Sequence, residues 1–164
     1  MSAARTSAAI VVNSPLGALT LREYDGKLTA IDFGRTVEPD DERSTPFLLT
    51  VAQQLDAYFF CNLKHFDVAL APAGTEFEQA VWRAMLAIPP GGTRTYGDVA
   101  KQLAGSARAI GGACGRNPIP IIIPCHRIIA AHGELGGYSG RGGLTTKKFL
   151  LELEGWQPAQ PAFL

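Results

Sequence analysis

The stretch TEFEQAVWRAMLAIPPGGTRTYGDVAKQLAGSARAIGGACG, residues 75–115, holds three successive helix signals and decides the fold class of the second half of the chain. Thr75, followed three residues later by Glu78, forms a capping-box pattern at the start of the first helix. Apolar residues then recur at helical spacing until the Pro-Pro-Gly-Gly breaker at residues 89–92. Thr95 is a cap for a second helix over residues 96–105, and a third helix follows over residues 106–115.

The second and third of these helices are short and are joined by a turn at Gly105, an arrangement typical of a helix-turn-helix. The third helix has almost no side-chain bulk, although each glycine costs a helix about 1 kcal/mol relative to alanine. Two explanations stay open: the backbone approaches another molecule closely, or the helix packs tightly against a neighbouring helix. The small residues are Ala107, Ala109, Gly111, Gly112, Ala113 and Gly115.

The residues before this stretch are typical of a small β-sheet with one helix. Residues 8–34 contain apolar runs, alternating positions and the hairpin dipeptide Asp25-Gly26. Residues 45–60 carry apolar side chains at helical spacing, and residues 65–72 alternate like a further strand. The sequence therefore predicts an α+β protein: an N-terminal α/β domain over residues 1–73 with a small antiparallel sheet, and a C-terminal helical domain over residues 74–164 with a winged-helix-like helix-turn-helix.

Charge is distributed unevenly along a chain whose formal net charge is zero. Residues 93–148 carry eight basic and two acidic side chains, whereas residues 1–92 carry seven basic and eleven acidic ones. A basic segment of this kind fits one face that meets phosphate, and it fits an ordinary solvated surface equally well.

Composition excludes several classes of protein. Hydrophobic residues make up 46% of the 164 residues, enough for a real core. No apolar run approaches the roughly 18 residues of a membrane span, and we expect a soluble, cytoplasmic protein. The three cysteines, Cys61, Cys114 and Cys125, form no CxxC pair, so we expect no disulfide framework, no metal site and no cofactor.

The segment RNPIPIIIPCHRII, residues 116–129, holds the candidate chemistry. Residues 121–123 are three isoleucines between prolines, which predicts a buried extended segment that leads to Cys125. A lone cysteine with apolar neighbours is usually an inert core residue, and these residues alone leave that alternative open for Cys125. A thiolate is, however, favoured beside cationic or hydrogen-bonding partners such as His126 and Arg127. Because adjacent residues of a strand point to opposite faces, we expect a water between the thiol and the His126 base rather than direct contact.

These residues resemble the family of O6-alkylguanine-DNA alkyltransferases, whose active-site motif is PCHR. The resemblance covers nearly the whole chain, in order: SPLGALTL near residue 14, residues 58–103, residues 106–129, and GGYSG with KKFLLELEG at residues 136–155. It implies direct-reversal repair of double-stranded DNA. The alkyl group of O6-alkylguanine, and of O4-alkylthymine, passes once and irreversibly to Cys125 after the base is flipped from the minor groove.

The resemblance also implies a role for each matching residue. Cys125 is the acceptor, His126 the base acting through water, Glu154 the carboxylate that orients it, and Asn117 the buried turn residue before the active segment. Arg108 fills the gap left by the flipped base. The remaining DNA contacts are Tyr96, Ala107, Ala109, Gly111 and Arg127, and the base-binding residues are Tyr138, Ser139 and again Tyr96.

The sequence departs from the family pattern in a longer loop at residues 138–144 and in Cys114 with the order Gly115-Arg116. The expected partner is DNA, with no membrane; the protein is expected to be a monomer, and cooperative binding on DNA stays open. Two other classes are weighed. A lesion-binding module would not need Cys125, His126 and Glu154 together, and a cysteine hydrolase would need an oxyanion hole but no basic DNA-binding helix.

Overall fold

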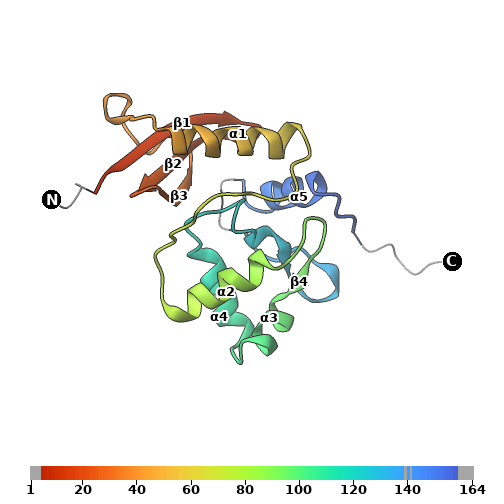
Figure 1. The fold of residues 1–164 in the computed structure, drawn as a ribbon. Helices are drawn as coiled ribbons and strands as arrows, with labels where there is room; N and C mark the ends of the chain where they lie inside the picture. Colours follow the sequence, from red (N-terminus) through yellow and green to blue (C-terminus); the bar gives the residue numbers. More distant parts are fainter. Residues whose placement is uncertain (1–4, 139, 141, 159–164) are drawn as a thin grey trace. The chain divides into compact units, whose positions relative to one another are not determined.

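The computed structural model describes residues 5–138, 140 and 142–158, and the chain divides into two compact units. The first comprises Met1–Gly74 with Pro118–Ile122, and the second comprises Thr75–Asn117 with Ile123–Leu164. The first unit holds a small antiparallel sheet and one long helix, whereas the second is mainly helical (Figure 1). The predicted α+β fold class is confirmed.

The sheet of the first unit is a three-stranded antiparallel meander of β1 (Ser7–Ser14), β2 (Gly17–Tyr24) and β3 (Lys27–Phe33). Asp25 and Gly26 join β2 to β3 with φ values of 53° and 79°, the left-handed pair that a type I′ turn requires. The predicted hairpin is therefore confirmed.

Helix α1 (Pro46–Phe60) lies against β1 and β2 and closes the core of this unit (Figure 1). Thr45 caps the helix by accepting a hydrogen bond from the Leu48 amide at 3.0 Å. The face turned to the sheet is buried, as the apolar spacing predicts, and comprises Leu48, Val51, Leu55, Tyr58 and Phe59. A short 3-10 helix, η1 (Pro39–Asp41), precedes it.

The strand predicted over residues 65–72 is wrong. This segment makes only an isolated parallel bridge between Leu70 and Leu28. The backbone of Asp67 pairs instead with the side-chain amide of Gln54, which donates to its carbonyl at 2.9 Å and accepts from its amide at 2.8 Å. A side-chain amide thus satisfies the backbone groups that a ladder would otherwise hold.

The second unit contains the predicted helices. They are α2 (Glu76–Leu86), α3 (Tyr96–Gln102) and α4 (Ala107–Gly115) (Figure 1). A further helix that was not predicted, α5 (Leu144–Leu153), follows later in the chain. Thr75 and Thr95 both form complete capping boxes, with Glu78 and Asp98 respectively. The indole Nε1 of buried Trp82 donates to the Ala113 carbonyl at 3.0 Å, which fixes α2 against α4.

The turn of the helix-turn-helix differs from the expectation in one residue. Ala104, not Gly105, adopts the left-handed conformation, with φ of 53°, and the Gly105 amide donates to Ala100 O at 2.9 Å. Gly105 leaves room for a neighbour: a Cβ there would lie 3.2 Å from the Phe77 ring, so the ring would have to shift slightly.

The isoleucine segment is buried as predicted, but it is not extended. Ile121 has φ of 74°, and the Ile122 amide donates to Pro120 O at 2.9 Å, which defines a γ-turn of the rarer, positive-φ kind. Pro124, with φ of −84° and ψ of 68°, then makes an inverse γ-turn, and the Cys125 amide donates to Ile123 O at 2.8 Å. Two tight turns therefore precede Cys125, where proline and β-branched residues suggested a strand.

Candidate active site

Cys125 begins the 3-10 helix η2 (Cys125–Arg127), which leads into β5 (Ile128–Ile129), the parallel partner of β4 (Arg94–Thr95). The residue is 6% exposed and lines a cavity. Burial raises the pKa of its thiol, while a hydrogen bond from the Asn117 side chain, the Lys147 charge and the backbone amides of Cys125 and His126 lower it. The site therefore opposes thiolate formation by desolvation and supports it by directed donors and one cation.

His126 is fully buried, and its Nε2 lies 2.8 Å from Oε2 of Glu154. Burial lowers the pKa of the imidazole, more than the neighbouring carboxylate raises it. A neutral ring beside a carboxylate must donate from Nε2, which leaves Nδ1 as the acceptor. Nδ1 is buried and has no hydrogen-bond partner among the described residues. Since both residues lie on a 3-10 turn, the opposite-face argument for a strand does not apply to Cys125 and His126.

Glu154 is the C-cap residue of α5 and the centre of a buried charge cluster. Its desolvation raises the pKa of the carboxyl, but hydrogen bonds from Arg127 and His126 outweigh it and lower the pKa to about 2. Gly91, with φ of 83°, lets the backbone pass this residue: a Cβ there would lie 3.1 Å from Glu154 O.

The placement of Arg127 corrects the expectation that it contacts DNA. Its side chain is 9% exposed, and its guanidinium donates from Nε and Nη2 to the two carboxylate oxygens of Glu154, both at 2.8 Å. Nη1 donates to Ile88 O at 2.6 Å. These bonds engage all three nitrogens of the guanidinium inside the protein, so Arg127 holds the carboxylate that faces His126.

A cavity of about 660 Å³ joins the thiol to the helix-turn-helix. Six of the predicted site residues line it: Cys125, Tyr96, Ala107, Arg108, Gly111 and Tyr138. Ala109 does not line the cavity, and Ser139 lies outside the described residues. Asn117 is half-buried and reaches the thiol from the end of α4; its Nδ2 also donates to Ile123 O at 2.8 Å.

Two tyrosines of the cavity keep their protons at neutral pH. Burial raises the pKa of Tyr96 to about 12, and its hydroxyl donates to Gly137 O at 3.4 Å. Burial also raises the pKa of Tyr138, whose hydroxyl is buried without a partner in the described part of the chain. The Tyr138 hydroxyl can therefore donate a hydrogen bond to a bound molecule, whereas the Tyr96 hydroxyl would first have to leave Gly137 O.

The glycines of α4 separate the two explanations for its missing bulk. A Cβ on Gly111 or Gly115 would meet nothing within 4 Å, and a Cβ on Gly112 would meet only the flexible Arg116 side chain. Packing against a neighbouring helix therefore does not explain Gly111 and Gly115. Their surface is open and free of bulk, as close approach of another molecule requires.

The basic segment is not a single basic face. Arg127 and Lys147 are buried, Arg116 pairs with Glu78, and Lys148 lies 3.8 Å from Glu152. Arg108 is exposed and makes no ion pair or hydrogen bond with any of the described residues. The sequence analysis missed Lys147, because it treated the lysine as one of the surface charges of the basic segment. Its position on the buried face of α5 was the one sequence feature that could have predicted its burial.

The described residues contain neither a metal-binding cluster nor a helix that could span a membrane. No group of three or more His, Cys, Asp or Glu side chains there could hold a metal ion. Among the same residues, no helix is both long and apolar enough to cross a membrane.

Known proteins match both units. The family model described as 6-O-methylguanine DNA methyltransferase, ribonuclease-like domain, matches residues 9–72, and the one described as its DNA binding domain matches residues 76–156. Methylated-DNA–protein-cysteine methyltransferases from Methanosarcina acetivorans and Mycobacterium tuberculosis are 45% and 47% identical. These alignments cover 88% and 87% of this chain, and 96% and 89% of the relatives.

Solved structures agree. The crystal structure of the Mycobacterium tuberculosis O6-methylguanine methyltransferase has a TM-score of 0.80 at 42% identity and covers 94% of this chain and 97% of its own. A structure of the Mycobacterium tuberculosis protein in complex with DNA has a TM-score of 0.77 at 45% identity, over 88% and 90% of the two chains.

Fold, cysteine site and similarity together define a DNA-repair methyltransferase. The chain belongs to the methylated-DNA–protein-cysteine methyltransferase family. This confirms the resemblance stated on the PCHR segment and the enzyme class that it implied.

Proposed function

We propose that this protein removes the alkyl group from O6-alkylguanine in duplex DNA by transferring it once to Cys125. The observation that carries the proposal is a buried series of neighbouring side chains: Cys125, His126, Glu154 and Arg127. Arg127 binds Glu154, Glu154 binds Nε2 of His126, and Nδ1 of His126 is left without a partner among the described residues. O4-alkylthymine, with an alkyl group on a similar exocyclic oxygen, is the second expected substrate. Action as a monomer and a cytoplasmic location stay predictions.

His126 supplies the base. The neutral imidazole is held by Glu154 through Nε2, so Nδ1 takes the thiol proton through a water molecule. The thiolate attacks the alkyl carbon, a carbon–sulfur bond forms, and the carbon–oxygen bond breaks with its electron pair left on guanine. The Tyr138 hydroxyl, which has no partner among the described residues, would donate to the leaving base, and the Tyr96 hydroxyl would do so after leaving Gly137 O.

The reaction stops after one transfer. The product is a thioether, which has no carbonyl for water to attack, unlike the thioester of a cysteine hydrolase. A second nucleophile would be needed to free Cys125, and none of the described residues that line the cavity has that role.

The experiment is a stoichiometric transfer assay. Incubation with an excess of duplex containing O6-methylguanine should add one methyl mass per protein, and peptide mass spectrometry should place it on Cys125. Cys125→Ser should gain none, and Cys61→Ser, at an exposed cysteine, serves as the matched control. Methyl removal beyond one equivalent would contradict the proposal and favour turnover; DNA binding with no transfer would favour a lesion-binding module.

We further propose that α4 enters the minor groove and that Arg108 fills the space of a flipped base. Arg108 is a long, exposed cation between alanines in the lining of the cavity, without an ion-pair partner among the described residues, and Gly111 leaves the helix surface open. Extruding a paired base costs a few kcal/mol, part of which an inserted side chain offsets.

The matched comparison for Arg108 is duplex against free base. Arg108→Ala should slow transfer from a paired lesion far more than transfer from free O6-alkylguanine, where no gap forms. An equal loss on both substrates would exclude the gap-filling role. A loss of affinity for every duplex would instead indicate a phosphate contact, if the slope of log binding constant against log salt concentration also became smaller by about one.

A further inference from the structure

Helix α4, on which the proposed DNA contact depends, is poorly suited to hold its own position. Three of its nine residues are the glycines Gly111, Gly112 and Gly115, which lower the stability of a helix. Its buried residues are Ile110 and Ala113, both of modest size. Short helices owe most of their stability to tertiary packing, and α4 has little side-chain surface to pack. Its orientation therefore depends on contacts of another kind.

Helix α2 supplies two such contacts with the C-terminal half of α4. The Trp82 indole donates to Ala113 O at 3.0 Å. One turn earlier on α2, Glu78 accepts through Oε2 from Nε of Arg116, the C-cap residue of α4, in an ion pair. Because the partners are spaced by about one helical turn on both helices, the two contacts together oppose rotation and sliding of α4 against α2.

Glu78 is a fixed anchor for this ion pair. Its side chain is 9% exposed, and its Oε1 accepts from the Thr75 amide at 2.9 Å within the capping box. Hydrogen bonds from the Thr75 backbone and from Arg116 lower the pKa of the carboxyl, so Glu78 is charged at neutral pH. One carboxylate therefore caps the start of α2 with one oxygen and holds the end of α4 with the other.

Arg116 has very different surroundings from its partner. Its side chain is 64% exposed, and its guanidinium lies over Gly112, where a Cβ would be 3.2 Å from Nη2. An ion pair with such an exposed member adds little to the free energy of unfolding. The pair therefore matters more for where α4 lies than for whether the protein folds.

We infer that Glu78 and Arg116 are positioning residues of the DNA site: their ion pair holds the end of α4 so that Arg108 and the open glycine surface face the duplex. Neither residue lines the cavity that contains Cys125, so neither touches the reacting atoms. The inference deepens the proposed function and rests on it for the DNA that α4 meets.

The test compares duplex DNA with free base in Glu78→Gln. Glutamine keeps an oxygen for the Thr75 amide, as capping boxes allow, but loses the charge that binds Arg116. Transfer from an O6-methylguanine duplex below saturation should slow about tenfold, since a small misplacement of a binding element is costly. Transfer from free O6-alkylguanine should keep the wild-type rate, and urea unfolding should change little. A purely structural role would not produce this split between the two substrates.

The sign of the Glu78→Gln effect separates positioning from direct phosphate binding. If Arg116 served only as a phosphate contact, removal of a neighbouring negative charge would leave duplex affinity unchanged or raise it. Positioning predicts a loss of duplex affinity instead, which fluorescence anisotropy with unmodified duplex measures.

Variants of Arg116 complete the comparison. Arg116→Met should slow duplex transfer as Glu78→Gln does, and the double variant should be no slower than either, because both changes break one contact. Arg116→Lys keeps a charge for Glu78 and should retain most of the duplex rate. Arg83→Met, which removes an exposed arginine from α2, is the matched control and should leave duplex and free-base rates unchanged.

The inference is overturned by wild-type duplex affinity and transfer in Glu78→Gln, or by equal slowing on duplex and free base. If Glu78→Gln folds poorly, Arg116→Met, at an exposed side chain, gives the same decision. A wild-type protein that accepts no methyl group, with duplex affinity lowered by Glu78→Gln, would refute the proposed function and leave the positioning role standing. One methyl group per wild-type protein, with both variants unchanged, would do the reverse.

Discussion

Two arginine–carboxylate pairs with equal contact distances lie in very different surroundings. On the sheet of the first unit, Arg22 Nε donates to Asp32 Oδ2 at 2.8 Å, and about a third of each side chain is exposed, 35% and 34%. In the second unit, Arg127 Nε donates to Glu154 Oε1 at 2.8 Å, with 9% and 2% exposed. Water and salt screen the first pair, whereas breaking the second would leave an uncompensated buried charge.

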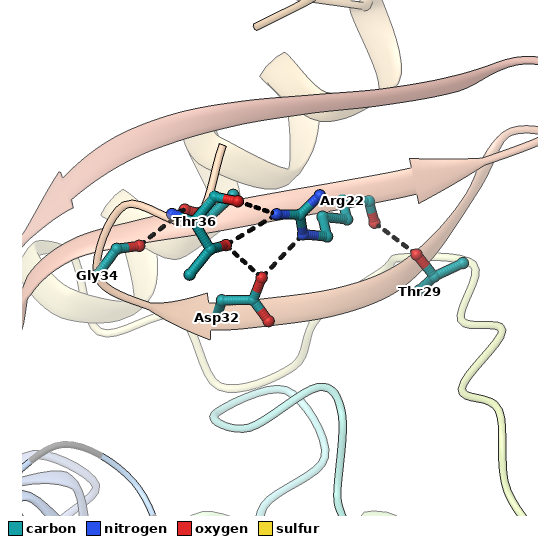
Figure 2. A network of polar contacts seen from close by, with 6 residues as sticks. Arg22, Thr29, Asp32, Gly34 and Thr36 are labelled. Atoms are coloured by element: carbon teal, nitrogen blue, oxygen red, sulfur yellow. Dashed lines mark hydrogen bonds and ion pairs between the residues drawn. The ribbon is translucent and has the colours of Figure 1, made fainter. Parts of the chain in front are cut away.

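The two networks also end differently. The Arg22 network closes on itself: Thr36 donates to Asp32 and accepts from Arg22, which also donates to the Thr36 carbonyl (Figure 2). It ties the segment after β3 to the sheet surface. The Arg127 network continues through Glu154 to His126, whose second ring nitrogen has no partner among the described residues. An arginine–carboxylate pair therefore anchors a surface segment in the first unit, whereas in the second unit it orients the side chain of His126.

The largest effect is expected for Glu154→Gln. Loss of the carboxylate removes the acceptor that fixes His126 and strands the Arg127 charge. We expect transfer to slow about 10²–10⁴-fold and the free energy of unfolding to fall by about 3–5 kcal/mol. Single-turnover kinetics and urea unfolding measure the two effects, and binding of unmodified duplex should change little.

His126→Ala separates the loss of transfer rate from the loss of stability. Its transfer should slow in the same range, yet Arg127 and Glu154 keep their pairing, so its loss of stability should be smaller than that of Glu154→Gln. Wild-type transfer by either variant would assign Glu154 a purely structural role.

Acid should weaken the buried pair in a defined pH window. The pKa of Glu154 is lowered in the folded state to about 2, from an ordinary value of 4.5. Its contribution is therefore present above about pH 5 and is lost as the pH falls toward 2, an order-of-magnitude effect of about 2–4 kcal/mol. Urea unfolding of the wild type and of the double variant Glu154→Gln/Arg127→Met, from pH 6 to 2.5, measures it. A difference that stays constant over this range would contradict the low pKa.

Arg127→Lys should have a smaller but clear effect. Lysine keeps the charge but cannot reproduce the fork on Glu154 together with the bond to Ile88 O, so we expect a loss of about 1–3 kcal/mol. Arg22→Lys is the matched change in the exposed pair. Equal losses in the two variants would mean that burial does not distinguish the pairs.

The smallest effect is expected for Asp32→Asn. An exposed pair contributes about 0–1 kcal/mol, and the Arg22 guanidinium stays hydrated when its partner is neutralised. Thermal unfolding should change little, and methyl transfer should stay at the wild-type rate. A loss as large as that of Glu154→Gln would show that the surface network carries the first unit.

Much of the scaffold could be predicted because it depends on neighbours in the sequence. Thr75 and Thr95 formed capping boxes, Asp25-Gly26 formed the hairpin turn, and the three helices of residues 75–115 appeared where their spacing placed them. The two errors have different causes: a distant side chain explains the first, and two tight local turns explain the second. The Gln54 side chain binds the backbone of Asp67, where a strand was predicted. Turns at Ile121 and Pro124 occur where an extended segment was predicted.

By itself, the sequence determined the fold class, the family and the identity of the candidate thiol, because helix caps, hairpin dipeptides and the PCHR motif are local patterns. Only the tertiary structure decided what each charge does. In the sequence, Arg127, Lys147 and Arg108 are basic residues of one segment. In the fold, Arg127 is buried against Glu154, Lys147 is buried against two backbone carbonyls, and Arg108 is exposed. The reason is physical: the energy of a charge depends on burial and on partners far away in the chain, and neither is written in its neighbours.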